Sequence, residues 1–321
     1  MHEVTVALIQ EAVQTLNGVA HVTPIVTSRT LDEISDARVF LKCENFQRAG
    51  AFKFRGAYRA VSHWVATSSQ RTFVTVSSGN HGQGLALACQ VLGCTAHVVM
   101  PKTSSSVKQD AVRLYGALIH ETEDRARAIA LCDCMARELP AVIIHPFNDP
   151  LVIAGQGTVM VELLEQVADL DAVLAPIGGG GLLSGLCVAA ETLRPQLEIF
   201  ACEPAGALDA FESVRQNRVV PMANPDTIAD GLRTSLGDQT LPILRRRLTG
   251  FFVVEEREIL QAMRFAYERL KLVIEPSSAV ALAPLLRKEP QLEGKRVAVV
   301  LTGGNADLSL LWSGLRKEIN R

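Results

Sequence analysis

Residues 172–185 read Ala-Val-Leu-Ala-Pro-Ile-Gly-Gly-Gly-Gly-Leu-Leu-Ser-Gly, two apolar runs joined by four consecutive glycines. The first run is short and apolar throughout, which is typical of a strand buried on both faces of a parallel sheet. The glycines indicate a turn, and the second run predicts a helix that continues to Leu193. A strand, a glycine-rich turn and a helix in this order predict one unit of an α/β fold.

The same alternation runs along most of the chain. Apolar runs predict strands at 39–43, 72–76, 96–100, 118–121, 141–144, 172–176, 198–202 and 297–302. Amphipathic stretches between them predict helices, among them 84–92, 105–114, 125–139 and 157–167. The predicted fold class is α/β, with a mostly parallel sheet covered on both faces. We predict a small α/β domain at 69–149, inserted into a large domain made of 1–68 and 150–321, with a ligand cleft between them.

The composition argues against several classes of function. Of 321 residues, 48% are hydrophobic and 21% are charged, with a net charge of -2, which is ordinary for a globular enzyme and unlike a nucleic-acid-binding protein. No apolar run approaches the roughly 20 residues of a membrane span. Residues 1–4 lack a signal-peptide pattern, so we expect a cytoplasmic protein. The seven cysteines include no Cys-x-x-Cys pair and are expected to be reduced.

The glycine run at 178–181 is a candidate phosphate site. Glycines let main-chain amides converge on a phosphate, and the positive end of the following helix favours its charge. No Gly-Lys-Ser/Thr follows, so this is not a Walker A loop. A dinucleotide-binding loop is the alternative: Gly179, Gly181 and Ser184 nearly match its spacing, and Glu203 ends the next strand, but the third glycine is missing.

Lys53 is a candidate for covalent chemistry. A lysine that forms a Schiff base must be unprotonated, and its apolar neighbours Phe52 and Phe54 could supply the desolvated setting this requires. The alternative is a surface lysine at the start of a helix at 56–65. Taken with the glycine run, an amine and a phosphate site predict a cofactor that carries an aldehyde and a phosphate, namely pyridoxal 5'-phosphate.

A second small-residue loop, Ser-Ser-Gly-Asn-His-Gly at 77–82, follows the strand 72–76 and opens a helix. Free main-chain amides at a helix N-terminus bind anions, so this loop suits a substrate carboxylate. The alternative is a tight turn in which Ser78 caps the helix. The substrate-binding candidates in this loop are Ser77, Ser78, Gly79, Asn80 and His81.

Two further candidate sites follow strands in the C-terminal half of the chain. Glu203 and Asp209 lie six residues apart with main-chain carbonyls between them, and such oxygens could hold a divalent cation. The alternative is a strand end followed by an acidic helix start. Thr302 follows the last strand and could present a hydroxyl to a cofactor ring nitrogen; a turn with a helix cap is the alternative.

Together these motifs resemble the fold-type II pyridoxal-phosphate enzymes, whose fold is like that of the tryptophan synthase β subunit. The resemblance is to the serine/threonine dehydratase family, in its serine racemase and threo-3-hydroxyaspartate ammonia-lyase branch, and it covers residues 23–305. The motifs occur in family order: Phe-Lys-x-Arg-Gly at 52–56, Ser-x-Gly-Asn-His at 77–81, Ala-Gly-Gln-Gly-Thr at 154–158, the glycine run, Ala-Asp-Gly at 229–231, Glu-Pro-Ser at 275–277 and Thr-Gly-Gly-Asn at 302–305. The resemblance implies two open twisted sheets in a large and a small domain, and a homodimer.

The resemblance also implies residue roles. Lys53 would be the Schiff-base lysine, and Ser78 would act on the opposite face of the cofactor. The implied cofactor-binding residues are Phe52, Lys53, Asn80, Gly178, Gly179, Gly180, Gly181, Leu182 and Thr302. The implied ligands of a divalent cation, magnesium or manganese, are Glu203, the carbonyl of Ala207, and Asp209. Arg125 resembles a substrate-binding residue of the hydroxyaspartate branch; a solvated arginine at a helix start is the alternative.

The implied activity is that of a lyase. It would eliminate water from a 3-hydroxy amino acid to give a 2-oxo acid and ammonia, with Lys53 as the general base at Cα. We place L-threo-3-hydroxyaspartate first, then L-serine or L-threonine. Racemisation of serine through Ser78 is the main alternative, and a nicotinamide-dinucleotide enzyme is a more distant one.

Overall fold

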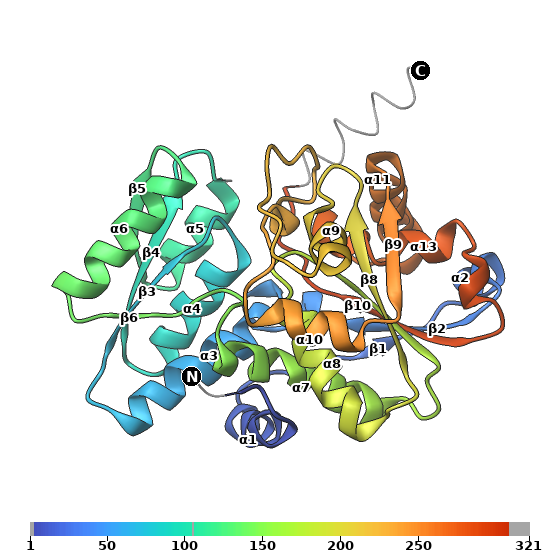
Figure 1. Ribbon diagram of the computed structural model, residues 1–321, viewed down its shortest axis with the longest axis horizontal. Helices are drawn as coiled ribbons and strands as arrows, with labels where there is room; N and C mark the ends of the chain where they lie inside the picture. Colours follow the sequence, from blue (N-terminus) through green and yellow to red (C-terminus); the bar gives the residue numbers. More distant parts are fainter. Residues whose placement is uncertain (1–2, 105, 308–321) are drawn as a thin grey trace.

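The computed structural model describes residues 3–104 and 106–307 of the chain, which form two open sheets (Figure 1). The larger sheet has six strands in the order β1-β2-β10-β7-β8-β9. Its strands are β1 (Ile25–Val26), β2 (Arg38–Cys43), β7 (Ala172–Pro176), β8 (Glu198–Pro204), β9 (Gly250–Val254) and β10 (Arg296–Leu301). The smaller sheet has four strands in the order β5-β4-β3-β6. They are β3 (Thr72–Val76), β4 (Thr95–Pro101), β5 (Leu118–Thr122) and β6 (Val142–Ile143).

Neighbouring strands in both sheets are parallel, except for the antiparallel pair β1–β2. This confirms the predicted α/β class with mostly parallel sheets. Each predicted strand is present, with ends that differ by at most two residues. The short β1 and the edge strand β9 were not predicted, although β9 reads Gly-Phe-Phe-Val-Val and is as apolar as its neighbours.

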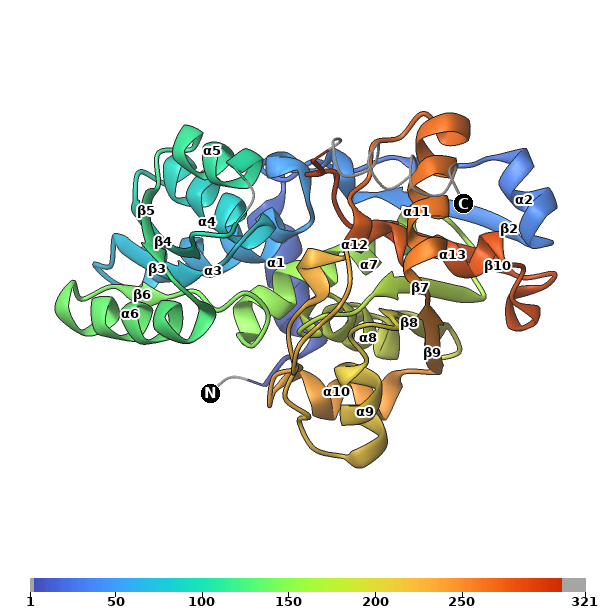
Figure 2. The ribbon, with the colours of Figure 1, turned by 90° about the horizontal axis from the view of Figure 1, so that it is seen from above.

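Helices cover both sheets (Figures 1 and 2). Those around the large sheet are α1 (Val6–Leu16), α2 (Arg29–Ser35), α7 (Pro150–Gln166), α8 (Gly181–Leu193), α9 (Asp209–Gln216), α10 (Thr240–Arg247), α11 (Glu256–Phe265), α12 (Pro276–Ala279) and α13 (Ala283–Leu286). Those around the small sheet are α3 (Lys53–Thr67), α4 (Asn80–Val91), α5 (Ser106–Leu114) and α6 (Arg125–Glu138). Among the described residues, no helix is both long and apolar enough to cross a bilayer. The cytoplasmic location stays a prediction.

The central strand β7 explains why its sequence is apolar throughout. Val173 and Ala175 belong to the hydrophobic cluster on one face of the large sheet, and Ala172 and Leu174 belong to the cluster on the other face. Successive strand residues point to opposite faces, so a strand covered on both sides has no position for a polar side chain. Burying each large aliphatic side chain contributes about 1.5–3 kcal/mol.

Helix α3 connects the two sheets. Phe54, Ala57 and Val61 share one hydrophobic cluster with Phe73 of β3 and Leu85 of α4, which belong to the small sheet. On its other side, the main-chain amide of Gly56 donates to Gln156 of α7. Because α3 packs on both units, the division of the chain into domains at 69–149 stays a prediction.

Candidate active site

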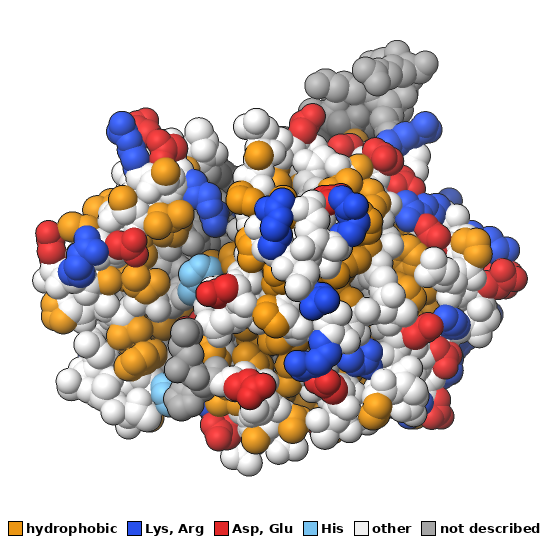
Figure 3. All heavy atoms as spheres, viewed as in Figure 1, with side chains coloured by type: hydrophobic (Ala, Val, Ile, Leu, Met, Phe, Trp, Pro, Cys, Tyr) orange, Lys and Arg blue, Asp and Glu red, His pale blue; other side chains and the backbone are white. Residues whose placement is uncertain are grey.

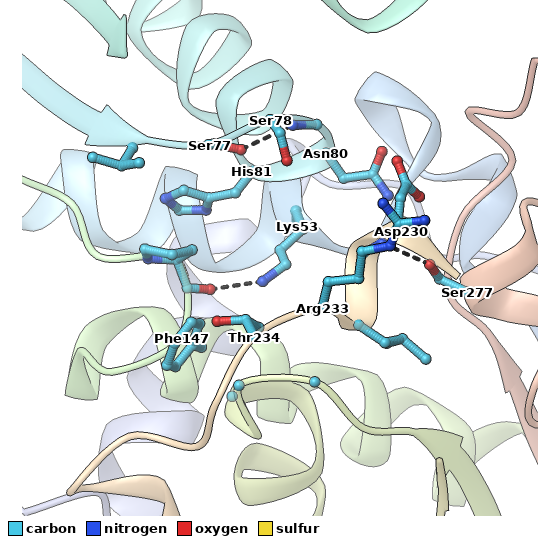
Figure 4. Close-up of a pocket in the computed structure, with 18 of the residues that line it drawn as sticks. Lys53, Ser77, Ser78, Asn80, His81, Phe147, Asp230, Arg233, Thr234 and Ser277 are labelled. Atoms are coloured by element: carbon cyan, nitrogen blue, oxygen red, sulfur yellow. Dashed lines mark hydrogen bonds between the residues drawn. The ribbon is translucent and has the colours of Figure 1, made fainter. Parts of the chain in front are cut away.

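A cavity of about 540 Å³ lies between the two sheets, where loops after the carboxyl ends of β3 and β7 face each other (Figure 4). Parallel strands gather their carboxyl-end loops at one edge, which is where ligands bind in open α/β sheets. The structure brings all the predicted cofactor and substrate residues to this cavity. They are Phe52, Lys53, Ser77, Ser78, Gly79, Asn80, His81, Arg125, Gly178, Gly179, Gly180, Gly181, Leu182 and Thr302. Their individual roles stay predictions.

Lys53 is the first residue of α3, and its Nζ donates to the main-chain oxygen of Pro146 at 2.7 Å. Burial lowers the pKa of this amine to about 8, and the nearby carboxylate of Glu275 opposes the change. The amine is therefore easier to deprotonate than an exposed lysine, as a Schiff-base lysine requires. The backbone before Lys53 is fixed because the amide of Phe52 donates to the carbonyl of Thr302 at 3.1 Å.

A buried ion network supports the start of α3. The guanidinium of Arg55 is fully buried and contacts Glu44 at 2.8 Å and Glu162 at 2.6 Å. Lys42 joins the network through Glu162 at 2.7 Å. Because β2, α3 and α7 all contribute to it, the network holds Lys53 against the large sheet. Arg55 belongs to the Phe-Lys-x-Arg-Gly motif at 52–56, but no role for it was predicted.

The loop at 77–81 shows which serine makes the turn. The Oγ of Ser77 accepts hydrogen bonds from the amides of Gly79 at 3.2 Å and Gly82 at 2.9 Å. The N-cap residue of α4 is Gly79, and the hydroxyl that accepts from the first turn is that of Ser77, so the alternative in which Ser78 caps the helix is wrong. Ser78 instead lines the cavity. His81 is buried, and burial lowers its pKa to about 3, so its imidazole is neutral.

The glycine run is shaped for a small anion. Gly180 has φ +87, a left-handed conformation that glycine adopts without strain, and no side chain caps α8. A Cβ on Gly181 would lie 2.9 Å from Phe147, and one on Gly178 would lie 3.1 Å from the carbonyl of Gly231. The uncapped first turn of α8 therefore offers main-chain amides at the cavity wall, which fits the phosphate of pyridoxal 5'-phosphate.

Glu275 is a site residue that the sequence analysis did not single out. Its Oε1 accepts from the Nδ2 of Asn80 at 2.5 Å, whose Oδ1 accepts from Asn305 at 2.9 Å. Its Oε2 is buried without a hydrogen-bond partner among the described residues, 3.8 Å from the Nζ of Lys108. Burial raises the pKa of Glu275 to about 7. The Glu-Pro-Ser motif was the available signal, but nothing local indicated that its carboxylate reaches Asn80.

Arg125 begins α6 and lines the cavity from the side of the small sheet. Its Nη2 donates to the hydroxyl of Thr234 at 3.2 Å, which comes from the side of the large sheet. Burial lowers the pKa of its guanidinium. The side chain thus crosses the cavity mouth, and both interpretations of this residue remain open.

The predicted cation ligands lie outside this cavity. Glu203, at the end of β8, accepts from the amides of Ala210 at 2.7 Å and Phe211 at 2.9 Å, and burial raises its pKa to about 8. Burial also raises the pKa of Asp209 to about 7, and its Oδ2 is buried without a partner in the described structure. Within residues 3–104 and 106–307, no group of three or more His, Cys, Asp or Glu could hold a metal. A cation here would therefore need main-chain oxygens such as that of Ala207, and the unpaired Oδ2 fits such a cation.

Comparisons with known proteins agree with this geometry. A family model described as pyridoxal-phosphate dependent enzyme matches residues 17–303. The chain is 41% identical over 316 residues to a serine racemase of Arabidopsis thaliana, covering 97% of this chain and 96% of that one. It is 44% identical over 291 residues to a beta-hydroxyaspartate dehydratase of Paracoccus denitrificans, covering 90% and 92%. The solved structure of a maize serine racemase superposes with a TM-score of 0.93 at 37% identity over 99% of each chain.

Proposed function

Because the chain belongs to the family of pyridoxal-phosphate dependent enzymes, we propose that it eliminates water from a 3-hydroxy amino acid to give a 2-oxo acid and ammonia. The proposed first substrate is L-threo-3-hydroxyaspartate, ahead of L-serine and L-threonine. The observation that carries this choice is Arg125, a cavity-lining cation that has no salt bridge to a carboxylate in the described structure. A second carboxylate on the substrate would supply its partner.

The residues around the cavity have distinct tasks in this proposal. Bound pyridoxal phosphate would supply an electron sink for the electrons left on Cα. The main-chain amides of 178–182 bind its phosphate at the positive end of α8. Phe52, Asn80 and Thr302 hold its ring, and the loop at 77–81 takes the substrate α-carboxylate.

Lys53 moves the proton. With a pKa of about 8, its amine is partly unprotonated near neutral pH and can accept the Cα proton as general base. The carbonyl of Pro146 orients the amine by accepting from Nζ. The β-hydroxyl then leaves as water, with the electron pair of the breaking Cβ–O bond and a proton that replaces the one taken from Cα, and hydrolysis of the remaining enamine gives the 2-oxo acid and ammonia.

Thr302 favours elimination. Its hydroxyl would contact the cofactor ring nitrogen and would not hold a proton there as a carboxylate does, so the electron sink would be weaker. A weaker sink would disfavour transamination. Elimination tolerates it, because the leaving group takes the electrons.

Serine racemisation is the second candidate, and Ser78 favours it. Its hydroxyl lines the cavity, while Ser77 makes the hydrogen bonds of the turn. If Ser78 returns a proton to Cα from the face opposite Lys53, L-serine becomes D-serine. The family match favours pyridoxal phosphate over the nicotinamide dinucleotide that residues 179–184 left open.

The test is steady-state turnover of the pyridoxal-loaded enzyme with magnesium on the three L-amino acids, following the 2-oxo acid and the D-isomer together. We expect the highest kcat/KM with L-threo-3-hydroxyaspartate. In Arg125→Gln, kcat/KM for this substrate should fall more than kcat/KM for serine or threonine. A higher kcat/KM with serine or threonine would refute the substrate choice, and a dominant yield of D-serine would replace elimination by racemisation. Ser78→Ala should reduce the D-isomer more than the oxo acid.

A divalent cation at Glu203, Ala207 and Asp209 is part of the proposal, supported by the buried unpaired Oδ2 of Asp209. A homodimer is also proposed. Phe46 and Val273 are 48% and 42% exposed, and Asn45, the neighbour of Phe46, donates to the carbonyl of Val273, so the two segments that carry these apolar side chains are adjacent. Sedimentation of the wild type and of Phe46→Glu would test whether a second copy covers them; a dimer unaffected by the substitution would place the interface elsewhere.

A further inference from the structure

Four Lys or Arg side chains line the cavity, and one of them, Arg233, has no part in the chemistry described so far. Lys53 is the proposed base, and Lys108 pairs with Asp230 at 2.6 Å. Arg125 and Arg233 have no salt bridge to a carboxylate among the described residues; their hydrogen bonds go to neutral oxygens. Positive charges that line a cavity and lack a carboxylate partner indicate a ligand that brings negative charge.

Arg233 is held in place by one carbonyl. It follows the short helix η3 (Asp230–Leu232), and its Nε donates to the main-chain oxygen of Thr227 at 2.9 Å. Its Nη2 donates to the same oxygen. A guanidinium carries five N–H groups, so this anchor leaves others for a ligand. Figure 4 shows Arg233 near Asp230 and Thr234, among the side chains around Lys53.

Arg125 approaches from the other side of the cleft. Its hydrogen bond to Thr234 joins the start of α6 to the residue next to Arg233. The guanidinium of Arg125 contacts the residue that follows Arg233, whereas the guanidinium of Arg233 contacts the carbonyl of Thr227; both residues line the same cavity, from units that belong to different sheets. In Figure 3 the surface is indented between these units at the top of the view, and basic side chains lie on both sides of the indentation.

We propose that Arg233 is a specificity-determining residue, which together with Arg125 binds the side-chain carboxylate of a dicarboxylic 3-hydroxy amino acid across the cleft. This inference rests on the proposed function and adds Arg233, beside Arg125, as a second binding residue for the side-chain carboxylate of the substrate. The other anions already have sites, since the glycine run at 178–181 suits the cofactor phosphate and the loop at 77–81 suits the α-carboxylate. A serine or threonine side chain brings no charge to the two arginines, whereas a second carboxylate brings one that both can share.

The first test is a comparison of Arg233→Gln with Arg127→Gln on L-threo-3-hydroxyaspartate and L-serine. Arg127 is the matched control, because it lies two residues from Arg125 on α6, is exposed, and does not line the cavity. Loss of a charge-assisted hydrogen bond predicts a fall in kcat/KM for hydroxyaspartate of about 10- to 100-fold, mostly through KM, and of less than about threefold for serine. Equal losses for both substrates, or none, would overturn the proposal.

The second test measures binding without turnover. Succinate and butyrate both have four carbons and no amino group, but succinate has two carboxylates and butyrate has one. Calorimetric titration of the pyridoxal-loaded enzyme with each acid therefore isolates the contribution of the second carboxylate to binding. We expect succinate affinity to fall at least about tenfold in Arg233→Gln, to recover in part in Arg233→Lys, and to stay unchanged in Arg127→Gln. Butyrate affinity should not depend on Arg233.

The two proposals fail in different ways. If the wild type prefers serine but binds succinate through Arg233, the substrate choice is wrong and the carboxylate site stands. If hydroxyaspartate is preferred and Arg233→Gln behaves like Arg127→Gln, the substrate choice stands and the role of Arg233 is wrong. Succinate binding that Arg233→Gln leaves unchanged would also refute the role of Arg233.

Discussion

Removing a divalent cation is expected to destabilise the protein more at pH 8 than at about pH 5.5. Glu203 is 1% exposed, and its pKa is about 8 instead of 4.5. Asp209 is 7% exposed, with a pKa of about 7 instead of 3.8. A carboxyl group whose pKa is raised by folding stabilises the folded state below its ordinary pKa, and this contribution is lost as the pH rises through the raised value.

The magnitude follows from the same values. A tenfold change in a proton-binding constant corresponds to about 1.4 kcal/mol, so ionising Glu203 fully costs the folded state about 5 kcal/mol. The two carboxylates titrate as a pair, so we take the cost of one ionisation as the expected loss in the free energy of unfolding. Most of it, about 3 kcal/mol, falls between pH 5.5 and 8. A cation bound by both carboxylates would compensate their charge and remove this loss.

The assay is urea unfolding of the pyridoxal-loaded protein at both pH values, with a chelator or with magnesium. With chelator, the free energy of unfolding should be lower at pH 8, and magnesium should restore it there while changing little at pH 5.5. Asp209→Asn should lose the response to magnesium, whereas Asp133→Asn, an exposed position on α6, should respond like the wild type. Glu275 has a pKa of about 7 and titrates in the same pH range. The difference in the free energy of unfolding between the wild type and Asp209→Asn therefore isolates the contribution of Glu203 and Asp209. Identical curves with chelator and magnesium at pH 8, or an unchanged response in Asp209→Asn, would refute the reasoning.

Three further predictions concern the cavity wall and the buried ion network of Arg55. The rate at which apoprotein takes up pyridoxal 5'-phosphate should rise about tenfold per pH unit and level off near pH 8, where the Lys53 amine is unprotonated, and Lys53→Ala should show no such uptake in stopped-flow absorbance. Gly181→Ala should weaken cofactor affinity at least about tenfold by equilibrium dialysis, since its Cβ would meet Phe147 at 2.9 Å, whereas Gly250→Ala, with ordinary contacts at 3.5 Å, should not. Arg55→Lys should lower the free energy of unfolding by about 2–4 kcal/mol in urea, because a lysine cannot keep the paired contacts to Glu44 and Glu162; the exposed Arg71→Lys should be neutral.

The parts of the fold that local sequence specifies were predictable. Residues 172–185 predicted β7, the glycine turn and α8, because a strand buried on both faces must be apolar and the turn needs glycines at close contacts. Parallel strands of one sheet bring their carboxyl-end loops to one edge, so the loops that follow β7 and β10 were expected to meet. The structure confirms that they line one cavity.

Contacts across the cleft were not predictable in the same way. Asn80 and Glu275 are 195 residues apart, and Lys108 and Asp230 are 122 apart. Such pairs depend on how the two sheets are placed relative to each other, which no local periodicity specifies. The two neighbouring serines show the same limit at short range. Ser77 makes the hydrogen bonds of the turn. Ser78 has the same preference for capping positions, so the sequence alone could not tell which of the two would do so.

One segment, 230–240, connects the sites that were recognised separately. Its contacts are Asp230 to Lys108, Thr234 to Arg125, and Thr240 to the carbonyl of Gly179. The amide of Leu236 in the same segment hydrogen-bonds Asp209 and lowers its pKa, against the larger effect of burial.

A cation at Asp209 would therefore act on the glycine run through this segment, without contacting the cofactor. The consequence is coupling between two distant substitutions. Thr240→Val removes the hydrogen bond to Gly179, and a double-mutant cycle with Asp209→Asn should give an interaction of at least about 0.5 kcal/mol in cofactor affinity measured with magnesium. Additive effects would show instead that the cation pair and the glycine run are independent.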